Sequence, residues 1–354
     1  MTVPATMRAV LLTRHGDLDA LVVDPAWPTP SAAPLEVLVR VGACGINNTD
    51  INTRVGWYAQ GDDNGAWGEP LRFPVIQGAD VCGRIVAVGA GVPAGRVGER
   101  VLVDPWVRSA DAPNDLDQAG YVGSELPGGY AEYLAVPATN ACVVRSELSD
   151  AELAAFPTAA GTALDMLRRA DVQPGERVLV TGASGGVGGY AVQLAAALGA
   201  EAIGVCAPEK SAAVLALGAR ATIGRDEDPR AALRALSREH VDVVVDVVGG
   251  DGWAALIETL RRGGRYVVSG AIAGPLVGLD LRTLYLNDLV LIGATISPPA
   301  VFAELLALIE RGAIRPTLAA TYSLEQVAEA QQAFVAKRFV GKLVLAVGDS
   351  GGPH

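Results

Sequence analysis

Arg177 to Ala197 read RVLVTGASGGVGGYAVQLAAA, and this stretch is the strongest indication of the fold in the chain. The apolar run Val178–Val180 predicts a buried strand, and the apolar spacing from Val187 to Leu198 predicts a helix. Glycines and other small residues lie between the two. A strand, a glycine turn and a helix in that order favour a dinucleotide-binding site, because a pyrophosphate must approach backbone N–H groups at a helix N-terminus with no side chain in the way.

The glycine pattern itself departs from the motif G-x-G-x-x-G. Gly185 and Gly188 fit its second and third glycines, whereas Ala183 takes the first place. A tight turn without a ligand is the alternative interpretation. If the turn binds a cofactor, the residues that we expect to line it are Ala183, Ser184, Gly185, Gly186, Val187 and Gly188.

The composition argues against several classes of partner. The chain has 354 residues, enough for two domains or one large one, and its net charge of −11 argues against nucleic acid or an anionic membrane as a partner. The N-terminus shows no signal peptide, and no apolar run is long enough to span a bilayer. The four cysteines form no C-x-x-C pair, so neither a disulfide framework nor a zinc cluster is indicated. We therefore expect a soluble cytoplasmic protein with free thiols.

Residues 1–145 are rich in short strands. Alternating apolar runs predict strands at 7–14, 36–43, 80–89, 99–107 and 130–137, separated by a polar segment at 45–58 and by loops at 59–74 and 108–128. This density of short strands favours an all-β or mixed domain.

From Ser149 onward, strands alternate with helices. Ser149–Glu152 is a capping box that begins a helix, and Pro157 should break or kink it. Strands are predicted at 177–182, 201–206, 220–224, 241–246, 265–270 and 289–295, with helices at 209–217, 229–237 and 253–262. This alternation predicts an α/β fold with a doubly wound parallel sheet. Helices expected at 299–311 and 323–336 and a strand at 341–346 are assigned to the first domain, and the tail 348–354 is expected to be disordered.

Several short motifs, in a fixed order, resemble the medium-chain dehydrogenase/reductase superfamily over nearly the whole chain. They are GINNTD (45–50), PVIQGADVCG (74–83), GERV (98–101), GGYAEY (128–133), Thr162 with its neighbours, the nucleotide turn and GKLVL (341–345). The resemblance implies a GroES-like catalytic domain at 1–145, completed by 300–354, and a Rossmann NADP-binding domain at 146–299. It also implies an active site in the cleft between them.

Zinc members of that superfamily hold a catalytic metal at three positions that match Asn47, Ala79 and Thr158 here, and none of these is a competent zinc ligand. Cys44 lies on the preceding strand and is expected to be a small core residue. The structural zinc lobe is also missing, since residues 104–127 contain no cysteine. The chain therefore resembles the zinc-independent, quinone oxidoreductase-like branch. The loops at 59–72 and 104–127 are longer than that branch implies, so the resemblance does not extend to the substrate.

The cofactor is predicted to be NADPH. An NAD site needs an acidic residue at the end of the second strand, and residues 202–208 contain none, whereas Lys210 comes just after them, next to Glu209. Arg225 could add a second charge at the end of the next strand; a solvated lysine beside Glu209 is the alternative for Lys210. By resemblance, Val247 with its neighbours lies over the adenosine side, and Ser269, Gly270, Ala271 and Thr162 lie near the nicotinamide.

Without zinc, the negative charge that develops on the substrate needs hydrogen-bond donors. Enones and quinones delocalise that charge, so neutral donors suffice, and a conjugated substrate is favoured over a simple aldehyde or ketone. Asn47 and Tyr58 are the candidate hydrogen-bond donors, and Asp50 is expected to orient the loop. The alternative for Tyr58 is that it only packs against Trp57 in an aromatic cluster.

The predicted activity is therefore NADPH-dependent reduction of a small quinone or enone. A zinc-free alcohol dehydrogenase, carbonyl reductase or specialised biosynthetic reductase is one alternative, and a non-catalytic NADPH-binding protein is another. The apolar segment Leu289–Ala294 predicts the edge strand of the sheet, through which the family forms a homodimer.

Overall fold

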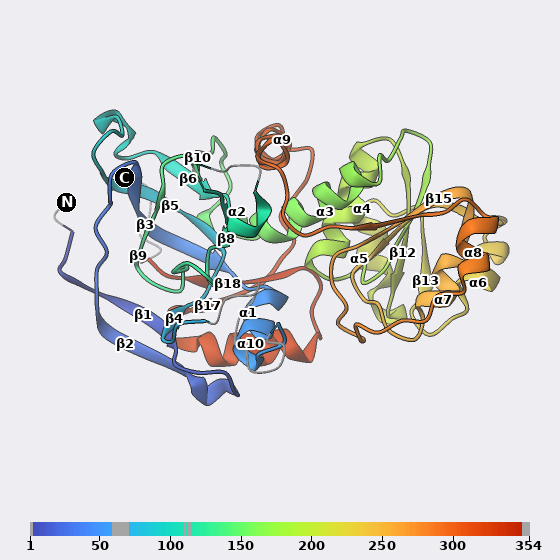
Figure 1. Ribbon diagram of the computed structural model, residues 1–354, viewed down its shortest axis with the longest axis horizontal. Coiled ribbons are helices and arrows are strands. Elements are labelled where there is room, and N and C mark those ends of the chain that lie inside the picture. Colours follow the sequence, from blue (N-terminus) through green and yellow to red (C-terminus); the bar gives the residue numbers. More distant parts are fainter. Residues whose placement is uncertain (1–2, 59–70, 110, 112–114, 349–354) are drawn as a thin grey trace. The chain divides into compact units, whose positions relative to one another are not determined.

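The computed structural model describes residues 3–58, 71–109, 111 and 115–348 (Figure 1). Two compact units make up the chain: Met1–Thr158 with Pro316–His354, and Ala159–Arg315. We refer to them as the first and the second unit. Their boundaries lie further along the chain than the expected ones at 145/146 and 299/300.

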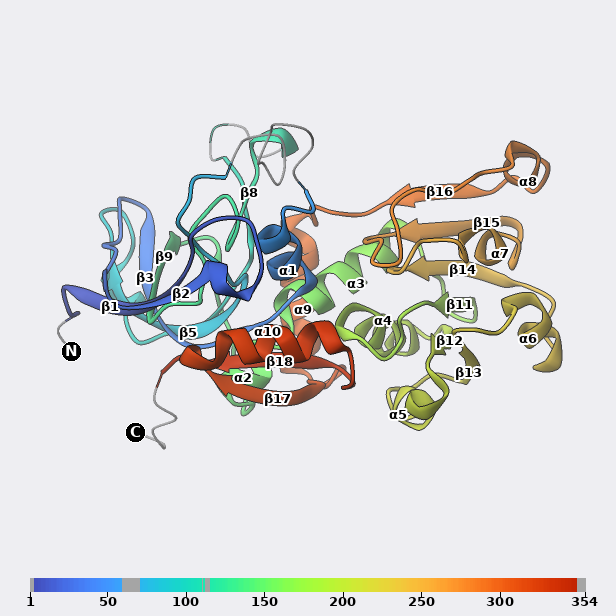
Figure 2. The same ribbon diagram turned by 90° about the horizontal axis from the view of Figure 1, so that it is seen from below.

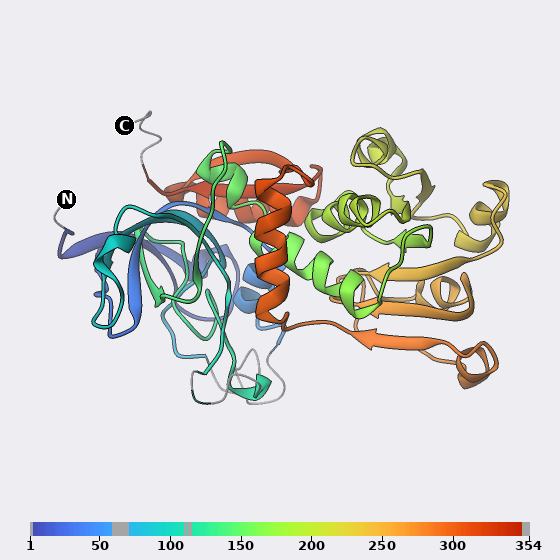
Figure 3. The same ribbon diagram turned by 90° about the horizontal axis from the view of Figure 1, so that it is seen from above.

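The helix α9 (Pro299–Glu310) explains the later boundary. Its Glu304 accepts a hydrogen bond from Arg168 Nε at 3.1 Å, so it belongs with α3 (Pro157–Arg169) and not with the first unit. Figure 3 shows the orange α9 beside the green α3. This corrects the assignment of helix 299–311. The predicted break at Pro157 is confirmed, because α2 (Asp150–Leu153) ends before it and Pro157 begins α3.

The first unit is built mainly of antiparallel strands. Their bounds are β1 (Thr6–Leu12), β2 (Leu21–Pro28), β3 (Glu36–Gly45), β4 (Val75–Ile76), β5 (Asp80–Val88), β6 (Arg100–Val103), β7 (Trp106–Val107), β8 (Gly120–Tyr121), β9 (Tyr133–Pro137), β10 (Ala141–Val143), β17 (Leu318–Ser323) and β18 (Lys342–Ala346). The large sheet has the order β10-β6-β5-β3-β18-β17, with β9 also paired to β3. A second sheet has the order β2-β1-β4, and β7 pairs with β8.

The strand β18 returns the end of the chain to this unit. It pairs antiparallel with β3, so that Val344 lies opposite Gly45. The assignment of strand 341–346 to the first domain agrees with this pairing. The alternating residues Val37, Val39 and Val41 of β3 are fully buried in the core, as the period of two predicts.

The polar segment 45–58, for which no helix was expected, contains α1 (Asn48–Val55). Its stability comes from its ends rather than from an apolar face. Asp50 accepts the backbone N–H of Asn47 at 2.7 Å at the start, and Gly56, with a φ of +74°, ends the helix in the left-handed region.

The second unit contains a six-stranded parallel sheet with the order β13-β12-β11-β14-β15-β16, as Figure 2 shows. The strands are β11 (Arg177–Val180), β12 (Glu201–Cys206), β13 (Ala221–Gly224), β14 (Val241–Asp246), β15 (Leu260–Val268) and β16 (Val290–Gly293). The helices besides α3 and α9 are α4 (Gly186–Ala197), α5 (Ser211–Ala216), α6 (Pro229–Ala235), α7 (Trp253–Ile257) and α8 (Leu281–Leu286). The predicted doubly wound sheet is confirmed.

The chain builds this sheet outward from β11 to β13 and then returns to β14 on the other side of β11. Ligands of such sheets bind at the carboxyl ends of the strands, at the point where the order reverses. That point is the end of β11, where the glycine turn begins.

Three segments with sequence-based expectations lie partly outside the described residues: the loop 59–74, of which 59–70 are not described, the loop 108–128, of which 110 and 112–114 are not described, and the tail 348–354, of which 349–354 are not described. Within the described part of the chain, no helix is both long and apolar enough to cross a membrane.

Candidate functional site

The tight turn after β11 is made at Gly182, whose φ is +58°. Ala183 lies one residue later and points into the interior: a Cβ added to Gly204 of β12 would lie 2.9 Å from the Ala183 Cβ. The small Ala183 side chain therefore packs against β12, and its place at the first position of the glycine motif stays a prediction.

The start of α4 is open to a ligand and closely packed beneath. Gly185 is the N-cap of this 12-residue helix and offers no side chain. A Cβ added to Gly188 would lie 2.3 Å from the carbonyl oxygen of Gly182, so only glycine fits there. Backbone N–H groups at a bare helix N-terminus suit a pyrophosphate, and the turn therefore fits the predicted dinucleotide.

The loops after β14 and β15 lie beside this turn. The backbone N–H of Val247 donates to Thr181 Oγ1 at 3.0 Å, and a Cβ added to Gly182 would lie 3.1 Å from Val247 Cγ2. The Ser269 N–H donates to the Asp246 carbonyl at 3.1 Å. Ala271 lies 3.3 Å from a Cβ added to Gly249, and Gly270, with a φ of +128°, lies between Ser269 and Ala271. The structure thus brings Val247, Ser269, Gly270 and Ala271 to the same sheet edge as the glycine turn.

The carboxylate at the end of β14 accepts its hydrogen bonds from groups within the protein. Asp246 is fully buried and accepts hydrogen bonds from Thr181 Oγ1 at 2.6 Å and Tyr266 OH at 2.7 Å. It also accepts from the N–H of Val248 at 2.8 Å. Asp246 therefore shapes the loop that follows β14.

Lys210 and Arg225 follow the ends of two neighbouring strands. Lys210 ends a 3₁₀ turn, Pro208–Lys210, after β12, and the Arg225 N–H donates to the Cys206 carbonyl at 2.9 Å. Arg225 Nε lies 3.6 Å from the exposed Asp226 carboxylate, a contact that water weakens. The two predicted cations therefore stand at the same sheet edge.

Thr162 lies on α3, half-buried and four residues after Thr158. Residues with this spacing share one face of a helix, so Thr158 and Thr162 point to the same side of α3.

In the first unit, a buried lysine forms hydrogen bonds to residues at and beside the positions that match the metal ligands of zinc members. Lys342 Nζ, at the start of β18, donates to Asp80 Oδ2 at 3.0 Å, to the Ile46 carbonyl at 2.8 Å and to Asn47 Oδ1. The side chains of Lys342 and Asp80 are 2% and 0% exposed. An ammonium group in such a place needs a carboxylate partner, and Asp80 provides it.

Tyr121 extends this cluster to α3. The other oxygen of Asp80 accepts the Thr158 N–H at 2.7 Å, and the Thr158 hydroxyl lies 2.7 Å from Tyr121 OH. Burial raises the pKa of Tyr121 well above its ordinary value, so it stays protonated at neutral pH. Sequence reasoning missed both Lys342 and Tyr121. A lysine within an otherwise apolar closing strand was a signal for the first, whereas nothing in the sequence points to the second.

Asp50 connects two segments of the backbone. It is buried, and its carboxylate accepts the N–H of Asn47 at 2.7 Å and that of Gly78 at 3.2 Å. Burial raises its pKa to about 6. These bonds support the predicted orienting role.

Tyr58 lies beyond the far end of α1 from Asn47. Its hydroxyl accepts a hydrogen bond from Asn52 Nδ2 at 3.0 Å, and Asn48 Nδ2 donates to Asn52 Oδ1 at 3.1 Å. Burial raises the pKa of Tyr58, which keeps it a donor. The eight residues of α1 span about 12 Å, so the two predicted donors stand at opposite ends of one helix.

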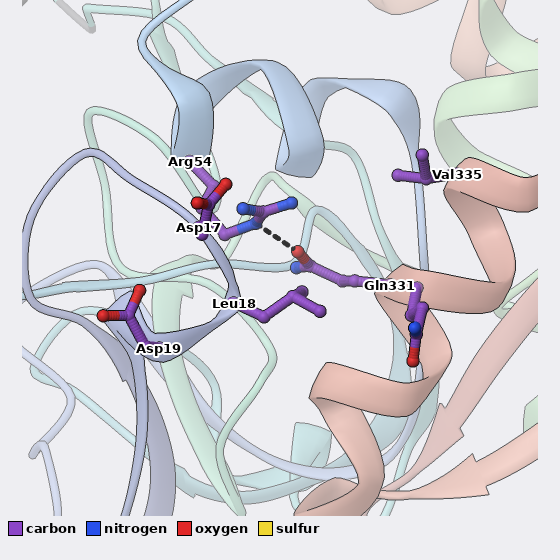
Figure 4. A pocket seen from close by; sticks show the side chains of 7 residues that line it. Asp17, Leu18, Asp19, Arg54, Gln331 and Val335 are labelled. Carbon is purple, nitrogen blue, oxygen red and sulfur yellow. Dashed lines mark hydrogen bonds between the residues drawn. The ribbon is translucent and has the colours of Figure 1, made fainter.

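A surface hollow of the first unit contains none of the predicted site residues (Figure 4). It is lined by Asp17, Leu18, Asp19, Arg54, Gln331, Gln332 and Val335. Arg54 Nε donates to Gln331 Oε1 at 2.8 Å, as drawn in Figure 4, Gln331 donates to Gln77 at 3.3 Å, and Gln77 donates to the Asp50 carbonyl at 2.7 Å. This chain of bonds ties α1 to α10 (Val327–Ala336) and so holds the helix that follows Asn47.

The residues at the metal positions do not suit zinc. Asn47, Ala79 and Thr158 include no thiolate, imidazole or carboxylate. Cys44 is fully buried in the apolar core, as expected, and burial raises the pKa of its thiol well above the usual range. Among the residues that the structure describes, no group of three or more His, Cys, Asp or Glu side chains is arranged to hold a metal ion.

Both units have counterparts among known proteins. Residues 33–146 match the alcohol dehydrogenase GroES-like domain, and residues 186–311 match the zinc-binding dehydrogenase model. An acryloyl-coenzyme A reductase of Metallosphaera sedula is 32% identical over 327 residues, which cover 89% of this chain and 93% of that protein.

Two solved structures extend the comparison. A putative alcohol dehydrogenase from Sinorhizobium meliloti 1021 is 48% identical, with a TM-score of 0.91 and 97% of each chain covered. A 2-octenoyl-CoA carboxylase reductase in complex with NADP and 2-octenoyl-CoA is 28% identical, with a TM-score of 0.84, covering 99% of this chain and 90% of that one. These likenesses extend over both units.

Proposed function

This chain belongs to the medium-chain dehydrogenase/reductase superfamily, and we propose that it is a zinc-independent, NADPH-dependent reductase of a conjugated C=C bond or a quinone. The observation that carries the proposal is the chemistry of the metal positions. Asn47 and Thr158 bring an amide and a hydroxyl, and Ala79 brings neither a ligand nor a donor. These side chains can donate hydrogen bonds to an oxygen, but they cannot hold a Lewis acid.

The second unit would hold the cofactor. The glycine turn Gly182–Gly188 and the N-terminus of α4 would bind the pyrophosphate, and Lys210 with Arg225 would bind the 2′-phosphate. Val247 would lie over the adenosine side, and Ser269, Gly270, Ala271 and Thr162 would hold the nicotinamide. When bound, the nicotinamide supplies a hydride.

The first unit would stabilise the charge that develops on the substrate. A hydride added to a conjugated C=C bond leaves the charge spread over an enolate, which a few neutral donors can stabilise. A simple carbonyl gives a localised alkoxide and needs a stronger electrophile. Asn47 and Tyr58 are the proposed donors, and Asp50 orients the loop between β3 and α1. The acryloyl and 2-octenoyl groups named for two similar proteins are conjugated acyl groups, which supports this substrate class.

The test is the oxidation of NADPH by a panel of acceptors: a quinone, a simple enone, an enoyl thioester and an aromatic aldehyde. We expect turnover of at least one conjugated acceptor and little with the aldehyde. Turnover of the aldehyde alone would support a carbonyl reductase, and binding of NADPH without turnover would support a non-catalytic protein.

Metal analysis tests the zinc-independent part. Protein purified without a chelator should contain well under one zinc per chain, and chelator treatment should leave turnover unchanged. One tightly bound zinc whose removal abolishes turnover would contradict this part of the proposal.

A further inference from the structure

Lys342 uses all three of its ammonium protons inside the protein. They go to the Ile46 carbonyl, to Asp80 Oδ2 and to Asn47 Oδ1. The Asn47 side chain matches a metal-ligand position, so a cation of the chain itself is bound to the residue where zinc members bind their metal. This positive charge cannot leave, because it is covalently part of β18.

The lysine determines which way the Asn47 amide points. An amide has an acceptor oxygen on one side and a donor NH₂ on the other, and an ammonium group accepts no hydrogen bond. A flipped amide would place its NH₂ against the ammonium. With Oδ1 held by Lys342, Nδ2 must therefore point away from it.

The side-chain NH₂ of Asn47 is therefore a hydrogen-bond donor without an acceptor among the described residues. Asn47 is 6% exposed, and within the described part of the chain its Nδ2 is buried without a hydrogen-bond partner. The nearby Asp50 carboxylate accepts the backbone N–H groups of Asn47, at 2.7 Å, and of Gly78, at 3.2 Å, and not the Asn47 side-chain NH₂. A buried donor without a partner is unfavourable, and an oxygen acceptor in a bound ligand would remove that cost.

We propose that Lys342 is a positioning residue: it holds the Asn47 amide with its NH₂ directed at the oxygen of the substrate. This inference rests on the proposed function for the identity of the ligand. The rival role for Lys342 is purely structural, as the counter-charge of Asp80.

The variants are chosen so that the protein keeps its fold. Lys342→Met alone would leave the Asp80 carboxylate buried without its cation, so it is combined with Asp80→Asn. The amide introduced at position 80 can still accept the Thr158 N–H. The matched control removes a partly buried ion pair elsewhere in the first unit, Arg100→Met with Asp150→Asn, and should leave kcat unchanged.

The kinetic test is a double-mutant cycle. We expect the Lys342→Met/Asp80→Asn variant to lose at least about tenfold in kcat, with the Kd of NADPH changed less than about twofold. Asn47→Ala should lower kcat similarly. Adding Lys342→Met/Asp80→Asn to Asn47→Ala should lower kcat no further, because no amide is left to position. If the two losses multiply, Lys342 does not act through Asn47 and the inference is wrong.

A second readout does not depend on turnover. In protein labelled with ¹⁵N-asparagine, the Asn47 side-chain NH₂ signals are those that disappear in Asn47→Ala. They should shift or broaden in Lys342→Met/Asp80→Asn and stay unchanged in the Arg100→Met/Asp150→Asn control. Unchanged signals in the first variant would overturn the inference. If the wild-type protein reduces no acceptor, the proposed function fails and this measurement alone decides the role of Lys342.

Discussion

Lys210 and Arg225 are the residues at which the choice of cofactor can be tested. We predict that Lys210→Ala weakens NADPH binding at least about tenfold and barely changes NADH binding, because a charge-assisted contact to phosphate contributes about 1.5–3 kcal/mol. Arg225→Ala should act in the same direction. Arg220→Ala is the control, because Arg220 precedes β13 and Arg225 follows it. Equal weakening of both cofactors by Lys210→Ala would show an effect on stability instead.

Tyr58 and Tyr121 are the two candidates for the second hydrogen-bond donor, besides Asn47, to the developing oxyanion. We predict that Tyr58→Phe lowers kcat about a hundredfold with little change in NADPH affinity, as loss of an oxyanion donor does. Tyr121→Phe is the comparison, because Tyr121 OH lies 2.7 Å from Thr158 Oγ1 in the same cluster as Asp80. Near-normal turnover in Tyr58→Phe together with a large loss of turnover in Tyr121→Phe would show that Tyr121, and not Tyr58, is the oxyanion donor.

The buried carboxyl of Asp104 should make the free energy of unfolding depend on pH. It is buried, and burial raises its pKa from 3.8 to about 6. The unfolded chain therefore releases this proton at a lower pH than the folded one, and the group lowers stability as pH rises from about 4 to about 6. Compared with Asp104→Asn, the wild type should lose up to about 3 kcal/mol of unfolding free energy over this range. Urea unfolding of both proteins across these pH values measures the difference, and a constant difference would contradict the prediction.

At the scale of elements, the close approach of α4 to the end of β11 depends on Gly188. We predict that Gly188→Ala costs about 1–3 kcal/mol in stability and weakens NADPH binding, because the new Cβ would lie 2.3 Å from the Gly182 carbonyl and push the helix away. Gly252→Ala is the control, since its φ is −72° and a Cβ there would meet open space. The measurements are thermal unfolding and cofactor titration; equal behaviour of the two variants would refute this account of the turn.

At the scale of the whole molecule, the edge strand β16 predicts a homodimer. Val290 and Leu291 are 48% and 37% exposed, and a strand edge with apolar side chains is usually covered by a partner. We predict a dimer by light scattering at micromolar concentration, and a monomer for Leu291→Asp. Leu215→Asp, at an exposed site on α5, should stay dimeric. A monomeric wild type would refute the proposal.

Local patterns in the sequence are enough to predict several parts of the molecule. The bounds of β12 and β14 were predicted to the residue, because strands buried in a parallel sheet form continuous apolar runs. The edge position of β16 and the glycine turn followed from the same reading of apolar runs and glycine spacing. The polar helix α1 was not predicted because its sequence has no apolar periodicity. Capping at Asn47 and Gly56 stabilises it instead.

Which chemical groups come into contact depends on the tertiary structure. Lys342 and Asn47 are 295 residues apart, and Tyr121 and Thr158 are 37 apart. The first contact exists because β18 pairs with β3, which brings the start of the closing strand to the end of the strand before Asn47. Pairing between distant strands depends on the whole sheet, and the burial that makes the Asn47 NH₂ an unused donor depends on everything packed around it. Neither can be inferred from the spacing of neighbouring residues, which is why the sequence shows Lys342 only as part of an apolar strand.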